Sequence, residues 1–276
     1  MQLDCRGRTL DLARPQVMGI LNVTPDSFSD GGQFRSREAA LAHARHMAEE
    51  GAAIIDVGGE STRPGSPPVS LQEELDRVIP VVERLHAELP LPVSVDTSKP
   101  EVMRAAVAAG AGMINDVYAL RMDGALTAAA ELGVPVCLMH MQGEPRTMQH
   151  EPSYTDVVAE VREFLAERAS AAVQAGIPHE RLLIDPGFGF GKRVDHNLSL
   201  MRHLPELLDI GLPLLIGVSR KSMIGAVTSA DIEHRIHGSV AAASLAAWLG
   251  AAIVRVHDVK ATVDALKVVS AVREAA

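Results

Sequence analysis

Cysteine is scarce in this sequence, and its scarcity argues against two classes of protein. The 276 residues include two cysteines, Cys5 and Cys137, and neither lies in a CxxC or another metal-ligand spacing. A disulfide framework and a cysteine-based zinc site both need more thiols at closer spacing. Neither is therefore indicated, and the cytoplasm is the expected compartment.

An excess of basic charge is also missing. The chain has 26 Lys and Arg residues against 35 Asp and Glu residues, a formal net charge of −9. A nucleic acid or an anionic membrane surface would be repelled by the molecule as a whole. We therefore expect no nucleic-acid partner, while a local basic site for a small anion stays possible.

Long apolar runs are lacking as well. No run approaches the roughly 18 residues of a membrane span, and the opening MQLDCRGRTLDLARP carries Asp4 and Asp11 without the apolar core of a signal peptide. No membrane partner is expected. The 47% of hydrophobic residues is enough for a large core in one long α/β domain or two short ones.

One phrase recurs along the chain: a helical stretch ends in glycine, and a short apolar run follows. The six instances are EEGAAIIDV, AAGAGMIND, ELGVPVCLM, QAGIPHERLLID, DIGLPLLIG and WLGAAIVRV. Glycine enters the left-handed conformation that ends a helix without a Cβ clash, so each phrase predicts a helix, a turn and a buried strand. HAELPLPVSVD adds a seventh junction with prolines, and PQVMGILN supplies a strand with no helix before it.

Eight strands are predicted in all, near residues 16–21, 53–57, 93–96, 113–115, 135–139, 181–185, 214–218 and 253–256. Their nearly continuous apolar character is typical of a parallel sheet covered by helices. Eight βα units predict an α/β fold, the TIM (β/α)8 barrel, with its active site at the C-terminal ends of the strands. A doubly wound sheet is the alternative, but NVTPDSF after the first strand is not its glycine-rich phosphate turn.

No linker or shift of composition divides the chain. We therefore expect residues 1–276 to form a single domain, in which residues 1–14 are an N-terminal extension.

Polar side chains follow every predicted strand. They are Asn22, Asp56 with GGESTRPG, Asp96, Asn115 with Asp116, His140, Asp185, Ser219 to Lys221, and Arg255 with His257 and Asp258. A single polar exit is most often a helix cap, and Asp116 and Asp258 fit that structural interpretation as well as a functional one. Eight such exits are too many for caps alone, and in a barrel they converge on one face.

The glycine-rich DPGFGFGK resembles a phosphate loop only superficially. Pro186 stands at the first glycine position of a Walker motif, and Arg193 follows Lys192 where Ser or Thr is required. The glycines are better explained by a backbone that passes close to a ligand, with Phe188 or Phe190 as an apolar wall.

The remaining exits suggest two kinds of binding surface. Asp96, Asn115 and Asp185 suit a flat heterocycle that offers N–H donors, because a carboxylate pairs with an amidine-like edge through two parallel hydrogen bonds. An anion site for phosphate or diphosphate is expected on the other wall, from Asn22, Thr62, Arg63, Arg255 and His257, with Lys221 between the two. The residues alone thus predict a barrel enzyme that acts on a phosphorylated planar heterocycle.

Nine phrases resemble, in order and from about residue 15 onward, the motifs of the dihydropteroate synthase family. They are ILNVTPDSFSDGG, DVGGESTRPG, SVDTSKPEV, INDV, MHMQGEPRTMQ, IDPGFGFGK, SRKSMIG, HGSVAAA and RVHDVK. The resemblance implies a transferase of folate biosynthesis that joins 6-hydroxymethyl-7,8-dihydropterin diphosphate to p-aminobenzoate and releases diphosphate. It also implies Mg2+ as cofactor, a homodimer, and inhibition by sulfonamides, which mimic p-aminobenzoate.

The same resemblance assigns roles to individual residues. It implies a pterin site of Asp96, Asn115, Met139, Asp185 and Lys221, and a diphosphate site of Asn22, Thr62, Arg255 and His257, where Asn22 also meets the magnesium ion. It implies a p-aminobenzoate site of Phe28, Asp30, Arg63, Pro64, Phe190, Lys221 and Ser222. Catalysis would fall to Asp96, Lys221, Arg255 and His257.

Two alternatives share the acidic pterin floor. A pterin-binding methyltransferase barrel would lack the diphosphate and aminobenzoate loops, whereas SFSDGG, STRPG and SRKS are present. An inactive pterin-binding paralogue should have lost Asn22, Lys221, Arg255 or His257, and all four are present.

Overall fold

Eight parallel strands form the centre of the computed structural model, which describes residues 1–23, 32–61, 65–144 and 147–275. They are β3 (Gln16–Asn22), β4 (Ile54–Gly58), β5 (Val93–Asp96), β6 (Met113–Asp116), β7 (Val136–Met139), β8 (Leu182–Asp185), β9 (Leu215–Ile216) and β10 (Ile253–Val256). All eight predicted strands are confirmed. β9 is shorter than its predicted range of 214–218.

The strands close into a barrel. Their order in the sheet is β8-β7-β6-β5-β4-β3-β10-β9, and a parallel bridge between Ile184 and Leu214 joins its two ends. Because all neighbours pair in parallel, the carboxyl ends of the strands share one rim. The predicted (β/α)8 architecture is confirmed.

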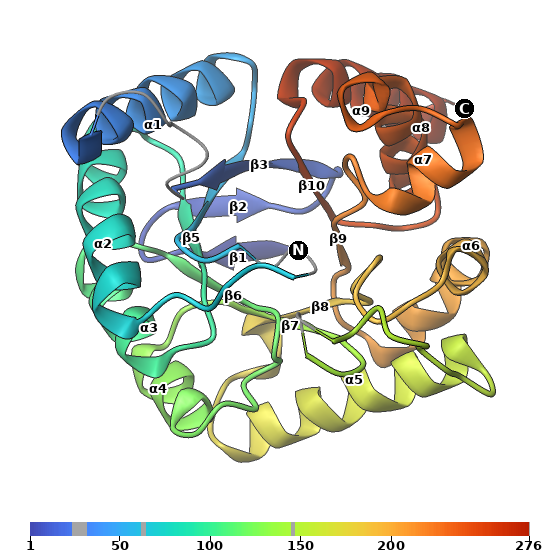
Figure 1. Cartoon of the computed structure of the whole chain (residues 1–276), viewed down its shortest axis with the longest axis horizontal. Helices are drawn as coiled ribbons and strands as arrows, with labels where there is room; N and C mark the ends of the chain where they lie inside the picture. Colours follow the sequence, from blue (N-terminus) through green and yellow to red (C-terminus); the bar gives the residue numbers. More distant parts are fainter. Residues whose placement is uncertain (24–31, 62–64, 145–146, 276) are drawn as a thin grey trace.

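Helices surround the strands (Figure 1). They are α1 (Gly32–Glu49), α2 (Leu71–Glu88), α3 (Pro100–Ala108), α4 (Ala125–Leu132), α5 (Val157–Gln174), α6 (Val194–Arg202), α7 (Ser222–Thr228), α8 (Ile236–Trp248) and α9 (Val259–Glu274). Short 3-10 turns lie at His179–Arg181, Leu204–Ile210 and Ile232–His234. In the six recurring phrases, the glycine that ends each helical stretch has φ between 63° and 113°, as a left-handed helix end requires.

The first residues form an element that the sequence did not predict. β1 (Gln2–Asp4) and β2 (Thr9–Asp11) pair antiparallel as a hairpin, which lies in the middle of the ring in Figure 1. Its buried Leu3 and Leu10 pack in one cluster with the inward-facing residues Met18, Ile54, Met113, Cys137, Leu183, Leu215 and Ile253. These residues lie in the first half of their strands, so the hairpin closes the barrel at the end opposite the polar rim.

The β1–β2 hairpin acts as a plug at this end of the barrel, and shortening one of its buried side chains is expected to destabilise the whole fold. Leu10 is 3% exposed, and Leu10→Ala should lower the free energy of unfolding by about 2–4 kcal/mol because it leaves a cavity in a dry core. Urea denaturation measures the loss, and Leu198→Ala, at a side chain that is 45% exposed, is the control, with an expected change of about 0.5 kcal/mol. Equal stability of the two variants would show that the hairpin contributes little.

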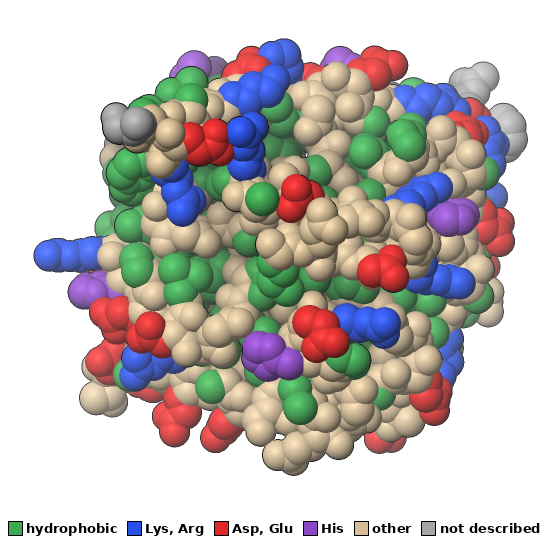
Figure 2. Space-filling model, turned by 180° about the vertical axis from the view of Figure 1, so that it is seen from behind, with side chains coloured by type: hydrophobic (Ala, Val, Ile, Leu, Met, Phe, Trp, Pro, Cys, Tyr) green, Lys and Arg blue, Asp and Glu red, His purple; other side chains and the backbone are tan. Residues whose placement is uncertain are grey.

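The described surface carries charges of both signs (Figure 2). Within the described residues, no helix is long and apolar enough to cross a membrane. Figure 2 shows acidic and basic side chains mixed over one face of the molecule, with no single basic field among the residues drawn in colour.

Candidate active site

The register of the sheet aligns three predicted exits across β3 to β6. Asn22 pairs with Gly58, Gly58 with Asp96, and Asp96 with Asn115. Asp185 is the last residue of β8 and pairs with Met139. Asn115 on β6 and Asp185 on β8 are both 5% exposed, so polar side chains that lie two strands apart in the ring contribute to a buried floor just below the rim.

Arg255, on β10, forms ion pairs with aspartates of two other strands. Its Nε donates to Asp56 Oδ2 at 2.6 Å, and its Nη2 donates to Asp96 Oδ2 at 2.8 Å. Asn115 Nδ2 donates to the same Asp56 oxygen at 3.1 Å. Burial alone would lower the pKa of Arg255, but Asp56 and Asp96 outweigh it and hold that pKa above its usual range. The guanidinium is therefore permanently charged inside the site.

The two floor carboxyl groups titrate near neutrality. Burial raises the pKa of Asp96 to about 7, although Arg255 opposes the shift. Burial also raises the pKa of Asp185 to about 6, although a hydrogen bond from Gly187 N at 2.7 Å opposes it. Carboxyl groups with such pKa values in a polar cleft are typical of a functional site.

Lys221 projects toward the floor from the turn before α7. Burial lowers the pKa of its ammonium to about 8, while the Asp185 carboxylate opposes that shift. Lys221 Nζ lies 4.0 Å from the centroid of the Phe190 ring, a distance at which a cation is attracted to an aromatic face. Phe188 is fully buried in the main core, so Phe190 is the phenylalanine that faces the cleft.

Gly189 lies close to Lys221. Its φ is +78°, and a Cβ added there would stand 3.2 Å from Lys221 Cδ. The glycine thus lets the loop after β8 pass close to the lysine. The sequence interpretation of DPGFGFGK expects a close approach to a ligand, and that stays a prediction.

A buried lysine that the sequence did not assign holds the same loop. Lys192 Nζ lies 3.0 Å from the carbonyl oxygens of Gly187 and Phe190 and 2.8 Å from His140 Nδ1. Burial lowers the pKa of Lys192 to about 7 and that of His140 to about 2, so the imidazole is neutral and accepts the bond. Lys192 therefore fixes the backbone between Asp185 and Phe190.

Removing the Lys192 ammonium is expected to loosen this loop. Lys192→Met keeps the length of the side chain but leaves buried acceptors unpaired, and it should cost about 1–3 kcal/mol of unfolding free energy. Lys260→Met is the control, because Lys260 is largely exposed and pairs with Asp264 on its own helix. Its expected cost is about 0.5 kcal/mol or less. Chemical denaturation checks both, and a neutral Lys192→Met would contradict the assigned contacts.

The structure describes some of the residues of the predicted anion site. His257 follows β10, and its Nδ1 lies 3.0 Å from Ser219 Oγ. Asn22 ends β3, where its Oδ1 and Asp96 Oδ2 are each 3.7 Å from the position of a Cβ on Gly58, so both flank the same space. Ser222 is the first residue of α7. Thr62, Phe28, Asp30, Arg63 and Pro64 lie outside the described residues.

Two of the polar exits, Asp116 and Asp258, have structural partners, and a third, Asp56, has no role assigned from the sequence. Asp116 accepts from the backbone of Tyr118 and Leu120, and Asp258 pairs with Arg220. Both therefore have structural partners, although neither side chain caps a helix. The sequence identifies Asp56 only as a polar exit, yet it is fully buried within β4 and contacts two predicted site residues, Arg255 and Asn115. A carboxylate inside the apolar run IIDV was the signal that could have identified it.

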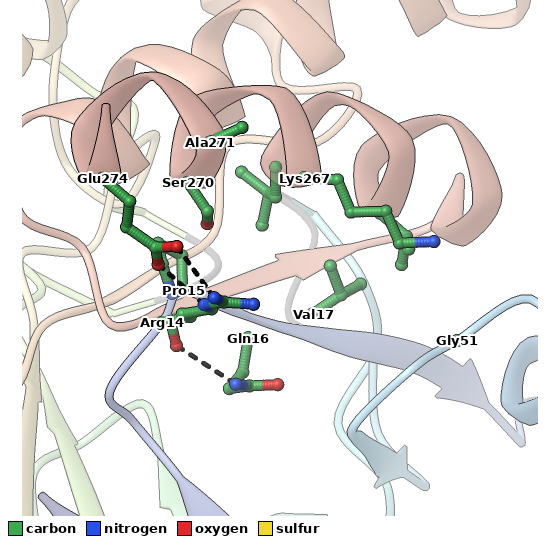
Figure 3. Close-up of a pocket in the computed structure, with 11 residues that line it drawn as sticks. Arg14, Pro15, Gln16, Val17, Gly51, Lys267, Ser270, Ala271 and Glu274 are labelled. Carbon is green, nitrogen blue, oxygen red and sulfur yellow. Dashed lines mark hydrogen bonds and ion pairs between the residues drawn. The ribbon is translucent and has the colours of Figure 1, made fainter. Parts of the chain in front are cut away.

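Two pockets lie in different parts of the molecule. One of about 350 Å3 reaches Asp96 between the loops that follow β4, β5 and β6. The other, of about 450 Å3, lies beside α9 and the start of β3, where Arg14 and Glu274 pair at 2.7 Å (Figure 3). That second pocket is at the amino end of β3, away from the rim that carries the titratable floor, and we place the candidate active site at the rim.

Known proteins share this arrangement over the whole chain. Residues 18–257 match the family model described as pterin binding enzyme. The dihydropteroate synthase of Escherichia coli is 57% identical over 271 residues, which are 98% of this chain and 96% of that protein.

Solved structures agree with the sequence relatives. The Xanthomonas albilineans dihydropteroate synthase with 4-aminobenzoic acid is 61% identical with a TM-score of 0.95, and the match covers 100% of this chain and 99% of that one. The Yersinia pestis enzyme in a sulfonamide drug complex is 55% identical with a TM-score of 0.95 over 100% of both chains. The chain therefore belongs to the dihydropteroate synthase family of pterin-binding enzymes.

Proposed function

We propose that this chain condenses 6-hydroxymethyl-7,8-dihydropterin diphosphate with p-aminobenzoate to give 7,8-dihydropteroate and diphosphate. The observation that carries the proposal is the floor of Asp96, Asn115 and Asp185, which lies beside the partly buried cations Arg255 and Lys221. Carboxylates and an amide suit the N–H edge of a pterin, and cations suit a diphosphate.

The pterin is proposed to bind flat on this floor. Asp185 has one oxygen engaged by Gly187 N–H, and its second oxygen is proposed to accept from the pterin. Asp96 is proposed to accept a hydrogen bond from another edge of the pterin, and Asn115 to bond it through its amide. Met139 is proposed to pack on the pterin ring, and Lys221 to donate a hydrogen bond to it. Met139 is 4% exposed in an apolar cluster with Phe190, which supports its place in the wall.

The diphosphate is proposed to lie between Asn22, Thr62, Arg255 and His257. Arg255 directs Nε and Nη2 to Asp56 and Asp96, so Nη1 is the guanidinium nitrogen placed to donate to a phosphate oxygen. Positive charge at this point stabilises the negative charge that develops on the leaving group.

Bond breaking is proposed to precede attack by the amine. Departure of diphosphate leaves a carbon conjugated with the dihydropterin ring, so the positive charge is delocalised, and the Asp96 carboxylate stabilises it electrostatically. The arylamine of p-aminobenzoate is mostly neutral at pH 7 and attacks without a strong general base. Its ring is proposed to lie against Phe190 and Lys221, its carboxylate near Ser222, with Phe28, Asp30, Arg63 and Pro64 completing the pocket.

Magnesium is proposed as the cofactor. No cluster of three or more His, Cys, Asp or Glu side chains with metal-binding geometry occurs among the described residues. Mg2+ does not need one, because it commonly binds one or two protein oxygens together with substrate phosphates and water. Asn22 Oδ1 at the rim fits such a site, and the ion would neutralise charge on the departing diphosphate.

A coupled assay for diphosphate release tests the reaction. Release from the dihydropterin diphosphate should depend on p-aminobenzoate, and dihydropteroate should accumulate in equal amount. A methyltransferase barrel would release no diphosphate, and an inactive paralogue would bind pterin without turnover. Either result would overturn the proposal.

Sulfonamides are proposed to compete with p-aminobenzoate. Raising the concentration of p-aminobenzoate should reverse the inhibition, whereas raising that of the pterin substrate should not. Inhibition that is insensitive to p-aminobenzoate would contradict the proposed pocket.

A homodimer is also proposed. Four large apolar side chains of α8 and α9 are more than half exposed: Leu245, Trp248, Val268 and Val272. Exposed apolar side chains that lie on neighbouring helices are typical of a protein interface, and α8 and α9 pack against one another. Light scattering should give twice the mass of the chain, and Trp248→Glu should shift the mass toward the monomer.

A further inference from the structure

Asp56 is a buried carboxylate without an assigned role. It lies at the centre of β4 and is fully buried. One of its oxygens, Oδ2, accepts from both Arg255 Nε and Asn115 Nδ2. Burying a carboxylate is costly, so a charge retained at this position calls for an explanation in terms of the groups that it contacts.

The geometry of Arg255 is unusual for a guanidinium between two acids. Arginine commonly pairs with a single carboxylate through two parallel N–H bonds. Here it divides its donors, with Nε on Asp56 and Nη2 on Asp96. Within the described part of the chain, no hydrogen bond reaches Asp96 Oδ1. Without Asp56, the guanidinium would be free to turn and occupy both oxygens of Asp96.

We propose that Asp56 is a positioning residue that holds Arg255 away from full pairing with Asp96 and thereby keeps Asp96 open to the pterin. This inference rests on the proposed function, since it assigns Asp96 to the pterin and Arg255 to the diphosphate. Asp56 touches neither substrate in this account. It acts through Arg255 and, by its bond from Asn115, also fixes the amide on the neighbouring floor.

Asp56→Asn is the sharpest variant. Asp56 Oδ1 is buried and has no hydrogen-bond partner among the described residues, and the same is true of Ser94 Oγ, on the residue directly opposite in β5. An asparagine can thus keep its oxygen at the Oδ2 position and place its amide on the side that is unpaired. The change deletes the charge with little change of shape.

The first measurement is the crystal structure of the Asp56→Asn variant. The guanidinium of Arg255 is expected to have turned, with two of its nitrogens on Asp96. An unmoved Arg255 would overturn the proposal. Ser94→Ala is the matched control, because it removes a neighbouring buried polar atom that has no bond to Arg255, and Arg255 should stay in place there.

The second measurement is the affinity for 6-hydroxymethylpterin, which carries no diphosphate. Calorimetric titration of Asp56→Asn should show binding weaker by about tenfold, the equivalent of about one hydrogen bond to a charged group. The Ser94→Ala control should bind like the wild type. Wild-type affinity in Asp56→Asn would overturn the proposal.

Kinetics separate positioning from a general structural loss. In Asp56→Asn the KM for the dihydropterin diphosphate should rise by about tenfold, while the KM for p-aminobenzoate should change less than about twofold, since its proposed residues do not contact Asp56. Equal changes in both constants would indicate a general loss of structure and overturn the proposal.

Two further precautions keep the outcomes distinct. If Asp56→Asn does not fold, the same three measurements are made on Asp56→Ser, whose hydroxyl group can accept a hydrogen bond and whose smaller side chain leaves room for water. The same results then support or overturn the role of Asp56. If the wild type fails to bind 6-hydroxymethylpterin, the proposed function fails. If the wild type binds it and the variant binds equally well, only the role of Asp56 fails.

Discussion

Asp185→Asn is expected to reduce pterin affinity by about a hundredfold or more while leaving the fold intact. The amide oxygen would take the Gly187 N–H bond at the place of Oδ1, and the amide nitrogen would then face the N–H donors of the pterin. A donor opposed to a donor replaces a charge-assisted bond, a loss of about 2–4 kcal/mol. Calorimetric titration with 6-hydroxymethylpterin measures it.

The control for this variant is Asp195→Asn. Asp195 is largely exposed and pairs with Arg193 at the surface, so its loss should leave affinity unchanged. Wild-type affinity in Asp185→Asn would remove Asp185 from the pterin site.

The pH dependence of pterin binding provides a second readout of the same floor. Burial raises the pKa of Asp185 to about 6 and that of Asp96 to about 7. A raised pKa means that each group is still protonated where an exposed carboxyl would be charged, so wild-type affinity should fall as the pH is lowered from 8 to 5. In Asp185→Asn one of the two titrations is absent, and the decline should be shallower. An unchanged slope would contradict this assignment.

Arg255→Met is expected to affect both stability and catalysis. The change leaves two buried carboxylates, Asp56 and Asp96, without their shared cation. Breaking a buried ion pair from one side costs about 3–5 kcal/mol of unfolding free energy. Loss of a preorganised positive charge at the leaving group should also lower kcat by about a hundredfold or more. Thermal unfolding and diphosphate release measure the two effects.

The sign of the pH effect distinguishes this mechanism from a packing defect. Without Arg255 the pKa of Asp96 rises further, so below that pKa the folded protein holds a neutral carboxyl group and the penalty is relieved. The stability deficit of Arg255→Met should therefore be larger at pH 8 than at pH 5.5. A deficit that does not change with pH would indicate lost packing.

Arg220→Met is the matched control for this second variant. Arg220 also pairs with an aspartate, Asp258, but its side chain is 40% exposed, and the pair should be worth about 1 kcal/mol or less. Equal effects of the two substitutions would show that burial does not decide the role of Arg255.

The sequence by itself determined the succession of elements and the residues at the rim. Both depend on local rules. Glycine ends a helix wherever a left-handed turn is needed, and apolar runs form buried strands, so the eight strands could be located from short windows. Once eight parallel units are recognised, their polar exits must share one face, because barrel closure brings all carboxyl ends to one rim.

Only the tertiary structure decided which of these exits have partners and which face the cleft. Asp116 and Asp258 were open to either interpretation, and their bonds to Tyr118 N and Arg220 made them structural. The β1–β2 hairpin could not be predicted, because two three-residue strands are too short to show a hydrophobic periodicity. Leu3 and Leu10 become buried only when the barrel closes around them.

The same limit applies to Asp56 and Lys192. Asp56 and Arg255 are 199 positions apart, and Lys192 and His140 are 52 apart, so no local window relates them. The sequence shows that a charge is present. Burial and the distance to a partner determine its pKa and its contacts, and both quantities arise only when the strands are brought together around the ring.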